Sequence, residues 1–416
     1  MKEILVEARL YAELRKKLDI ASLSKIDKGW SKDIKYCVIT ESGTKYLLRI
    51  SPTEQYRRKK DQFGLMQQVA DLGVPMCQPI KFGTCCEGVY SLQSWIEGVD
   101  AEEIIPGMTD IEQYDLGLEA GRILQKIHSI PAPDIQEDWE IRFNRKMDRK
   151  IQMYTDCPIK YEKGEAFIEY INANRHLLNN RPQCYQHGDY HIGNMMMDDA
   201  KKLYIIDFDR DDYGDPWEEF NRIVWCAQKA PLFASGMVDG YFDGSVPMDF
   251  WRLLALYISS NTLSSIPWAI PFGQEEINVM QNQAREVLTW YDHMQNPVPT
   301  WYIKPTSNSC FCGHDCLRCI TYLATVKNDN ILRKQSQQFY IETFGLDIPL
   351  DEIHCRGGRS KDVFYLCSNC PWMMCCKGKN IKSCSECTEY PCNPLADYME
   401  KYVNRCNQVQ EKRSKS

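Results

Sequence analysis

Long apolar stretches are missing from this chain of 416 residues. All of its hydrophobic runs fall far short of the roughly 20 residues that a membrane-spanning helix requires, so we expect no membrane partner. The first twenty residues also lack the basic-then-apolar order and the small-residue cleavage site of a secretory signal peptide. Both absences predict a cytoplasmic protein. The hydrophobic content of 44% and the charged content of 26% are typical of a soluble globular protein.

An excess of positive charge is also missing. The chain has 50 Lys and Arg residues against 57 Asp and Glu residues, which gives a net charge of −7. Acidic residues predominate before residue 300, whereas the segment 301–416 is slightly basic. An acidic main body argues against a nucleic-acid partner and is compatible with a cationic substrate.

The pattern of residues divides the chain into three parts. Residues 1–98 combine a helical pattern at each of 1–20 and 54–72 with several β-rich runs, which predicts a small sheet. Residues 99–300 are mostly helical in pattern, and a proline-rich boundary separates them from the cysteine-rich segment 301–416. We expect helices in this middle part at 110–128, 163–178, 217–230, 248–266 and 274–294.

Three polar side chains in the stretch 185–220 form the most specific pattern. Asp189 lies in a turn-rich segment with glycines on both sides, and Asn194 follows five residues later. Asp207 closes a short apolar run at 203–206 that is typical of a strand. One carboxylate can orient a hydroxyl or accept its proton, while a second carboxylate and an amide oxygen hold magnesium on nucleotide phosphates. The arrangement predicts magnesium-dependent phosphoryl transfer.

Each of these residues alone has an ordinary interpretation. A single aspartate or asparagine in such a segment is most often a turn former. His187 and His191 are four residues apart, which on a helix would suit a metal pair. The neighbouring glycines disfavour a helix, so we expect His187 to pack against the loop backbone instead.

Read in order, the stretch has the pattern H-G-D-x-H-x-G-N, then I-I-D-F-D, then G-D-P-x-x-x-F. This signature resembles the aminoglycoside phosphotransferase and choline kinase family, and the resemblance covers about residues 20–295. It implies an α+β, bilobal protein-kinase-like fold with an antiparallel sheet in the N-terminal lobe and a mainly helical C-terminal lobe. It also implies ATP or GTP with Mg²⁺ as cofactors and a hydroxylated small molecule as the acceptor.

The resemblance assigns roles to residues of the central stretch. Asp189 resembles the catalytic base that positions the substrate hydroxyl. Asn194 and Asp207 resemble the two magnesium ligands. Asp215 resembles the residue that braces the lobe behind the metal-binding loop.

The N-terminal lobe supplies the remaining nucleotide contacts that the resemblance implies. Arg49 lies where the family has a lysine or arginine that reaches the α- and β-phosphates. Gln93, Ser94 and Trp95 lie in the linker whose backbone would contact the adenine. The chain departs from the family at the helix glutamate that pairs with the phosphate-binding cation, because no glutamate occurs at that point. Asp61 could serve in its place.

Most of the 20 cysteines lie at or after Cys310. A cytosolic protein keeps its thiols reduced, so such a cluster is more often a metal site than a disulfide framework. Paired cysteines on short turns suit one tetrahedral zinc ion. Iron–sulfur binding is the second interpretation and unligated buried thiols are the third. The predicted zinc ligands are Cys312, Cys316, Cys319, Cys367, Cys370, Cys384, Cys387 and Cys392.

The same tail carries a second resemblance. The segments CGHDCLRC and EYPC are similar to a short cysteine-rich domain of unknown function. That domain has a further C-x-G-C element, and here the second cysteine of the element is absent after Cys355. The number of metals therefore stays open.

Our first hypothesis for function is an ATP-dependent kinase that phosphorylates a hydroxyl of a small molecule. Aminoglycoside-type antibiotics come first, then choline-like or sugar metabolites, and acidic residues such as Glu218 and Glu219 could receive their ammonium groups. The alternative is a catalytically weak kinase-like binding protein whose metal-binding tail mediates the interaction. The presence of Asp189, Asn194 and Asp207 favours the first hypothesis. Protein kinase activity is disfavoured because the motif is H-G-D rather than H-R-D. No oligomeric state is predicted.

Overall fold

The computed structural model describes residues 2–27, 33–305, 310–316, 319–360, 362–381 and 383–400, with side chains from residue 9 onward. The chain folds into two compact units. Unit 1 comprises Met1–Ile104, Arg122–Lys229 and Ser245–Thr300, and unit 2 comprises Ile105–Gly121, Ala230–Gly244 and Trp301–Ser416. These units are defined by packing alone, and the three-part division 1–98, 99–300 and 301–416 stays a prediction.

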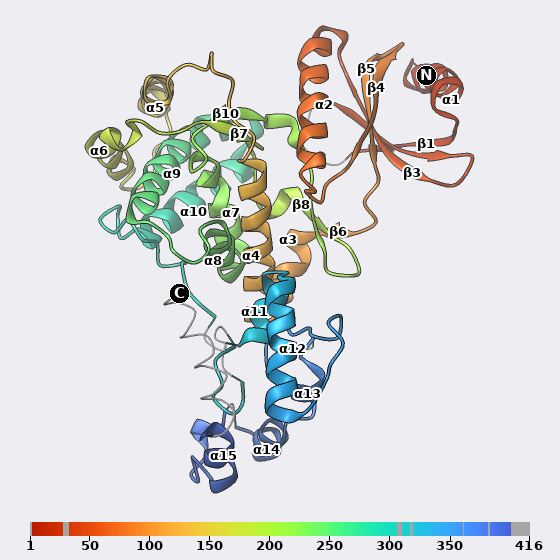
Figure 1. Ribbon diagram of the computed structural model, residues 1–416. Coiled ribbons are helices and arrows are strands. Elements are labelled where there is room, and N and C mark those ends of the chain that lie inside the picture. The colour runs from red at the N-terminus through yellow and green to blue at the C-terminus, as the bar shows by residue number, and fades with distance from the viewer. Residues whose placement is uncertain are drawn as a thin grey trace. The chain divides into compact units, whose positions relative to one another are not determined.

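Unit 1 begins with helix α1 (Lys2–Leu18) and a five-stranded antiparallel sheet in the order β1-β2-β3-β5-β4 (Figure 1). Successive side chains of a strand point to opposite faces, so one face of this sheet is apolar. That face supplies Val38, Leu48 and Leu92 to a core that Leu10 and Leu14 of α1 complete. The strands are β1 (Ile20–Ile26), β2 (Ile34–Thr40), β3 (Lys45–Ser51), β4 (Pro79–Cys85) and β5 (Gly88–Ser94).

The elements expected in this part of the chain are present. Strands β2 and β3 form a hairpin with Ile34 opposite Ile50, and Gly43 in its turn has a φ of +83°, which favours glycine. The helix expected at 54–72 consists of the short 3-10 turn η1 (Thr53–Gln55) and helix α2 (Tyr56–Asp71), which packs against β4 and β5. Strand β1 was not predicted, because its serines and lysine interrupt the apolar pattern.

Most of the remainder of unit 1 is helical, and two small antiparallel sheets carry the central stretch. Strand β10 pairs with β7, and β8 lies between β6 and β9. The strands are β6 (Val99–Asp100), β7 (Cys184–Gln186), β8 (Met195–Met197), β9 (Leu203–Ile205) and β10 (Asp212–Gly214). The helices are α3 (Ala101–Ile104), α5 (Trp139–Asp156), α6 (Glu165–Asn174), α7 (Ile223–Lys229), α9 (Met248–Ala269) and α10 (Gln274–Trp290). The 3-10 turns are η3 (Arg175–Leu178), η4 (Ile192–Asn194), η5 (Phe208–Arg210), η6 (Glu218–Arg222) and η7 (Ile270–Phe272).

Helix α5 is the main element of unit 1 that the sequence analysis missed. The Asp138 side chain caps its first turn by accepting a hydrogen bond from the Ile141 N–H at 3.3 Å. Trp139, Phe143 and Met147 recur every four residues and are buried, so one stripe of the helix faces the core. The helices expected at 110–128, 163–178, 217–230, 248–266 and 274–294 are present, in part as 3-10 turns.

Unit 2 is built around the first part of helix α4 (Asp110–Ile127) and helix α8 (Pro231–Tyr241). The two helices approach closely because Gly236 and Gly240 leave no side chain between them, and a Cβ at either position would clash with a carbonyl oxygen of α4. The cysteine-rich segment packs on these helices, and the Tyr322 hydroxyl donates a hydrogen bond to Asp115 at 2.5 Å. The other elements of unit 2 are η2 (Ile105–Gly107), α11 (Ile320–Val326), α12 (Asn330–Phe344), α13 (Tyr365–Ser368), α14 (Pro371–Lys379), η9 (Cys384–Glu386) and α15 (Asn393–Tyr398).

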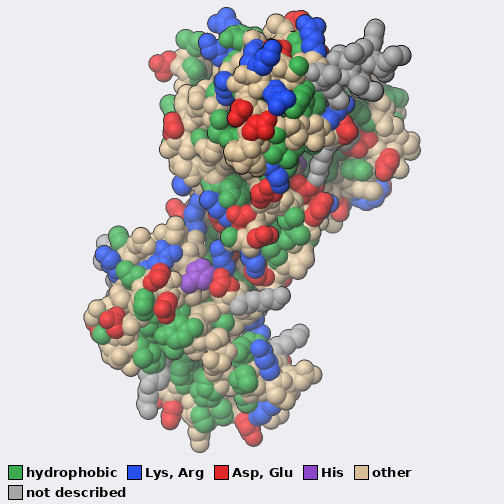
Figure 2. Space-filling model, turned by 90° about the vertical axis from the view of Figure 1, so that its right-hand side faces the viewer, with side chains coloured by type: hydrophobic (Ala, Val, Ile, Leu, Met, Phe, Trp, Pro, Cys, Tyr) green, Lys and Arg blue, Asp and Glu red, His purple; other side chains and the backbone are tan. Residues whose placement is uncertain are grey.

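Within the described ranges, none of the helices combines the length and the apolar character that a membrane crossing would need. Acidic and basic side chains are interspersed on the face that Figure 2 shows. The absence of a nucleic-acid partner stays a prediction.

Candidate active site

Asp189 lies in the loop after β7, and hydrogen bonds between the His187 side chain and the backbone fix this loop. His187 is buried, its Nε2 atom lies 3.0 Å from the Ile206 carbonyl oxygen, and its Nδ1 atom accepts a hydrogen bond from the Asp189 N–H at 3.2 Å. The proton of the imidazole is therefore on Nε2. The predicted packing of His187 against the loop backbone is confirmed. Gly188 has a φ of +81°, and a Cβ there would clash with the Arg210 carbonyl, so this position requires glycine.

Glu219 holds the same loop from the other side. Its carboxylate is buried and accepts hydrogen bonds from the Gly188 N–H at 3.0 Å and the Tyr190 N–H at 3.3 Å. Glu218 is also shielded, and its Oε1 atom accepts a hydrogen bond from Lys146 at 3.0 Å. Both carboxylates already have partners within the chain, and the suggestion that they receive ammonium groups of a substrate stays a prediction.

Positive charges surround the carboxylate of Asp189. Arg222 Nε lies 3.2 Å from Oδ1, and Arg210 Nε lies 3.7 Å from Oδ2. Burial alone would raise the pKa of Asp189, but Arg222 and the other nearby cations outweigh burial and hold this pKa below its usual value. Burial lowers the pKa of the neighbouring His191 to about 4, so that imidazole is neutral at pH 7. Asp189 is therefore ionised at neutral pH, as a base must be.

The other two residues of the predicted triad lie in the same loop system. The Asn194 Nδ2 atom donates a hydrogen bond to the Asp189 carbonyl oxygen at 2.9 Å. The Asn194 carbonyl oxygen accepts a hydrogen bond from the Ile206 N–H at 3.0 Å, directly before Asp207. Asp207 has a φ of 64° and a ψ of 63°, a left-handed conformation that is uncommon for aspartate. Such backbone strain is concentrated at functional sites.

The donor set at Asn194 and Asp207 fits a magnesium ion. Mg²⁺ prefers oxygen ligands and is usually held by one or two protein side chains together with substrate phosphates. The amide nitrogen of Asn194 is engaged by Asp189, whereas its amide oxygen accepts no hydrogen bond from the part of the chain that the structure describes. The Asp207 side chain is 31% exposed and so accessible to a ligand.

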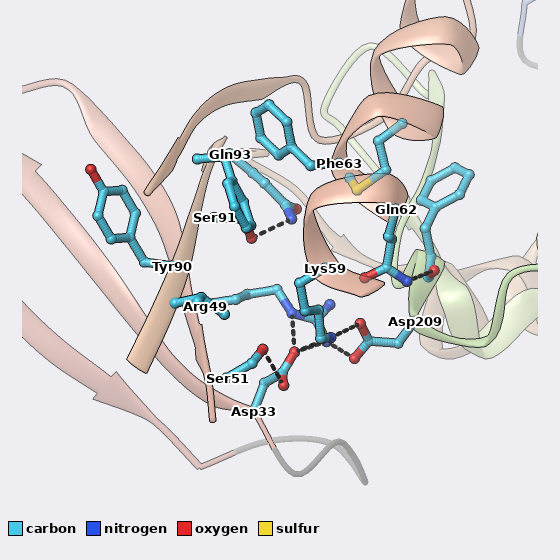
Figure 3. Close-up of a pocket in the computed structure, with 14 residues that line it drawn as sticks. Asp33, Arg49, Ser51, Lys59, Gln62, Phe63, Tyr90, Ser91, Gln93 and Asp209 are labelled. Carbon is cyan, nitrogen blue, oxygen red and sulfur yellow. Dashed lines mark hydrogen bonds and ion pairs between the residues drawn. The ribbon is translucent and has the colours of Figure 1, made fainter. Parts of the chain in front are cut away.

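Arg49 lies on β3 and is buried in a network of carboxylates (Figure 3). Its Nη1 atom donates to Asp207 Oδ1 at 2.8 Å, and its guanidinium also pairs with Asp209 and with Asp33 at 3.2 Å. Lys59 of α2 completes the network, because its Nζ atom lies 2.8 Å from both Asp33 and Asp209. Two cations and three carboxylates thus meet where the resemblance implies a phosphate-binding cation.

Asp61 does not replace the missing helix glutamate. It is exposed and forms no ion pair with Arg49. The carboxylate partners of Arg49 are Asp33, directly before β2, and Asp207 and Asp209, after β9. The buried neighbour Gln62 donates hydrogen bonds of 2.7 Å to the Phe208 carbonyl oxygen and to Asp211. The helix is therefore tied to the metal-binding segment by a neutral amide.

The space beside Arg49 is small. The pocket shown in Figure 3 has a volume of about 20 Å³, which is room for roughly one water molecule. Phosphates can reach Arg49 only if its carboxylate partners give way.

Of the linker residues, Gln93 lines this pocket, whereas Ser94 and Trp95 do not. Gln93 is buried, and its side chain donates to the Ser91 hydroxyl at 3.3 Å. The Ser94 N–H already donates to the Gln78 carbonyl oxygen at 2.8 Å. Ser94 and Trp95 line a second cavity of about 480 Å³. The predicted roles of all three residues stay predictions.

Asp215 is completely buried behind the catalytic loop. It accepts hydrogen bonds from Arg181 Nε at 2.6 Å, from the Tyr257 hydroxyl at 2.6 Å and from the Trp217 N–H at 2.9 Å. These contacts join α9 and η6 to the segment before β7, which agrees with the bracing role that the resemblance implies.

Replacing Asp215 by alanine is expected to destabilise unit 1 by about 3–5 kcal/mol, because the buried Arg181 charge would lose its partner. For a unit of this size that corresponds to a fall in Tm of roughly 10 °C in thermal unfolding followed by circular dichroism. Asp212→Ala is the matched control, because its carboxylate is 57% exposed. Equal effects of the two substitutions would contradict the bracing role, and adding Arg181→Met to Asp215→Ala should recover part of the loss.

The cysteines of the tail are distributed over separate apolar clusters. Cys312 and Cys384 pack with Cys376 and Leu395. Cys316 packs with Ile111 and Tyr322 in a second cluster. The closest sulfur pairs are Cys310 with Cys316 and Cys376 with Cys384, each at 3.6 Å.

The zinc prediction is not supported by this arrangement. Among the residues with described positions, no group of three or more His, Cys, Asp or Glu side chains is placed to hold a metal ion. Short cysteine spacings bring thiols close along the chain. Here Cys310 packs against the clusters of both Cys312 and Cys316, and the thiols pack as small apolar side chains. Iron–sulfur binding and unligated thiols stay predictions. The correction applies to Cys312, Cys316, Cys319, Cys367, Cys370, Cys384, Cys387 and Cys392.

Two family models match this chain. Residues 22–252 match the model of the phosphotransferase enzyme family, and residues 308–397 match that of a protein of unknown function (DUF3795). No curated protein matches the chain. Both resemblances drawn from the motifs are thereby confirmed.

Solved structures with a similar fold share little sequence with this chain. The GDP complex of aminoglycoside 2'-phosphotransferase-IIIa is 14% identical, with a TM-score of 0.51 over 70% of this chain and 99% of that chain. Amicoumacin kinase hAmiN in complex with AMP-PNP, Ca²⁺ and Ami is 14% identical, with a TM-score of 0.50 over 71% and 97%. A choline/ethanolamine kinase family protein from Mesorhizobium loti is 14% identical, with a TM-score of 0.50 over 71% and 98%.

The family match spans more than half of the chain and includes the loop of Asp189, the metal-binding segment and the sheet that carries Arg49. The expected α+β architecture, with an antiparallel sheet followed by a mainly helical part, is confirmed. The chain belongs to the phosphotransferase enzyme family and has a protein-kinase-like fold.

Proposed function

We propose that this protein is an ATP-dependent phosphotransferase that phosphorylates a hydroxyl group of a small molecule. One observation carries the proposal. Asp189 and Asn194 share one loop and Asp207 follows β9, and the hydrogen bond from the Ile206 N–H to the Asn194 carbonyl oxygen joins the two segments. In this proposal these contacts bring the Asp189 carboxylate, the Asn194 amide oxygen and the Asp207 carboxylate to one site.

Each residue has a distinct task in this proposal. Asp189 accepts a hydrogen bond from the acceptor hydroxyl, orients its oxygen and takes its proton. Asn194 and Asp207 hold the magnesium ion, which neutralises charge on the nucleotide phosphates when it is bound. The transition state of phosphoryl transfer is loose, so positioning and charge neutralisation account for most of the catalysis.

Arg49 has to change partners in such a cycle. In the structure its guanidinium binds Asp207 and Asp209, which are carboxylates of the metal-binding segment. A magnesium ion on Asp207 would compete for the same oxygen, and nucleotide phosphates would offer Arg49 new anionic partners. Arg49 then contacts the phosphates, as the family resemblance implies, while Asp33 retains Lys59.

The identity of the nucleotide and of the acceptor has to be tested together. Similar structures hold GDP or AMP-PNP, and their names refer to antibiotics and to choline or ethanolamine. The experiment is a radiolabelled phosphate-transfer assay with Mg²⁺ and either ATP or GTP, over aminoglycosides, amino alcohols and sugars. Phosphorylation of an added alcohol is the expected result. Nucleotide binding without transfer to any acceptor would favour the alternative of a kinase-like binding protein.

A further inference from the structure

The carboxylate of the proposed base is flanked by basic side chains. Arg222 at the end of η6 and Arg210 at the end of η5 lie 3.2 Å and 3.7 Å from the two oxygens of Asp189. Arg222 is about one-quarter exposed and Arg210 about one-half exposed, at 23% and 52% of their side chains. Both guanidinium groups can therefore be reached by a ligand.

These distances limit what the acceptor can carry next to its hydroxyl. A hydroxyl that is hydrogen-bonded to Asp189 lies about 2.6–3.2 Å from the carboxylate oxygens. Its neighbouring substituents then come within a few ångströms of Arg222 and Arg210. An ammonium group at that place would meet two like charges, whereas an anionic group would meet two hydrogen-bond donors.

A second pair of cations extends the basic surface along α5. Lys146 and Lys150 are one helical turn apart, so they project from the same side of α5. Lys146 pairs with Glu218 at 3.0 Å. The pKa of the Glu218 carboxyl is below its usual value although burial opposes this shift. The charges of Lys146, Lys150 and Arg222 outweigh burial and lower this pKa.

Lys150 is the cation of this group that lacks a partner. It forms no hydrogen bond and no ion pair with the residues whose positions the structure describes, although it is only partly exposed. Burial and the neighbouring charge of Lys146 lower the pKa of Lys150 to about 7. Four basic side chains, Lys146, Lys150, Arg210 and Arg222, thus lie around the carboxylates of Asp189 and Glu218.

We propose that the acceptor is an anionic alcohol, a hydroxylated molecule that carries a carboxylate or phosphate group, and that Arg222 and Lys150 bind that group. This inference rests on the proposed kinase function and narrows its substrate. It differs from the aminoglycoside-type acceptor that the family resemblance suggested first. Lys150 is a binding residue for the acceptor in this proposal and takes no part in the proton transfer.

Cations near a kinase base can also act on the transferred phosphoryl group, and the two roles have different consequences. If a cation contacts the phosphoryl group, removing that cation lowers kcat for every acceptor by the same factor. A contact with the acceptor's own anionic group affects only acceptors that carry one. The comparison therefore needs acceptors of the same ring and different charge.

The experiment is a calorimetric titration of the full chain, in the presence of Mg²⁺ and ADP, with four probes. The probes are glucose, glucosamine, glucuronate and glucose 6-phosphate, and kanamycin serves as a polycationic comparison. The same titrations are made with Lys150→Met and with Arg149→Met, an exposed cation on the same helix whose loss changes the net charge equally. A thermal melt of each variant checks that it is folded.

We expect glucuronate or glucose 6-phosphate to bind the wild type more tightly than glucose or glucosamine. Lys150→Met should weaken the anionic probe by roughly 10- to 100-fold, as loss of a hydrogen bond to a charged group does, and Arg149→Met should change it less than about twofold. Tighter binding of kanamycin or glucosamine, absence of anionic binding, or equal loss for glucose and the anions would overturn the inference.

A separate titration with MgATP distinguishes this inference from the function on which it rests. If the wild type bound the anionic probes but not MgATP, the kinase proposal would fail while the anion site stood. If MgATP bound and only cationic probes followed, the kinase proposal would stand and the anionic acceptor would fail.

Discussion

Asp207→Ala is expected to abolish the magnesium dependence of nucleotide binding and to lower kcat/KM by roughly 10³-fold or more. A metal ion on the transferring phosphates supplies several kcal/mol of charge stabilisation, and about 1.4 kcal/mol corresponds to a tenfold change in rate. Removing the carboxylate removes one of only two protein ligands that the site offers. The measurement is a titration of ATP with and without MgCl₂, followed by steady-state kinetics.

The fold should survive Asp207→Ala, because Arg49 keeps its ion pairs with Asp33 and Asp209. Asp199→Ala is a suitable control, since Asp199 is exposed in the turn before β9 and its loss changes the net charge equally. A variant that retained the wild-type effect of Mg²⁺ on ATP affinity would show that Asp207 is not a metal ligand.

Asp189→Asn is expected to keep nucleotide affinity and to lower kcat by roughly 10²–10⁴-fold, the usual range for a residue that transfers a proton. Asparagine keeps the shape of the side chain, but its amide cannot take the proton of the hydroxyl. The Asp189 backbone carbonyl would still accept the hydrogen bond from Asn194, so the metal-binding residues should stay in place. Asp199→Asn provides the same chemical change at an exposed site.

The pH dependence of the wild type offers a further check on the base. Because the pKa of Asp189 lies below its usual value, with Arg222 as the main charge that overcomes burial, the carboxylate stays ionised to a lower pH. The acid limb of kcat/KM should therefore fall below the ordinary range of an aspartate. Unchanged turnover in Asp189→Asn would show that another group takes the proton.

Local spacing was enough to predict the central site. Asp189 and Asn194 are five residues apart in one glycine-containing loop, and Asp207 follows two residues after the end of β9, so their proximity is set by short segments. The same holds for the β2–β3 hairpin and for α2, whose turn and end signals lie within the segment itself.

Contacts between distant segments could not be predicted in this way. The network of Asp33, Lys59 and Asp209 around Arg49 joins residues that are up to about 180 positions apart in the sequence. Each of these charges has an ordinary surface interpretation when it is considered alone. Helix α5 and its two lysines were missed although the spacing of Trp139, Phe143 and Met147 marks an apolar stripe that could have identified it.

The zinc prediction finds no support for a related reason. Closely spaced cysteines bring sulfur atoms near each other along the chain, but a metal requires their side chains to converge on one point. In this tail Cys312 and Cys316 lie in two apolar clusters, and Cys310 packs against both.

The composition of unit 2 has a consequence for any attempt to study the kinase alone. The unit takes residues 105–121 and 230–244 from within the segment that matches the phosphotransferase family, and the cysteine-rich segment covers them. A shortened chain that stopped at Thr300 would deprive buried Asp115 of the Tyr322 hydroxyl and buried Asp239 of Tyr302. It would also uncover the apolar side chains of α4 that pack with the tail.

Such a truncated protein should therefore be recovered mainly as aggregate, whereas a kinase joined to its tail by a simple tether would tolerate the cut. The two family matches are adjacent in sequence but interleaved in the fold. The two matched segments are therefore not independent domains joined end to end, because neither would bury its own apolar surface after separation.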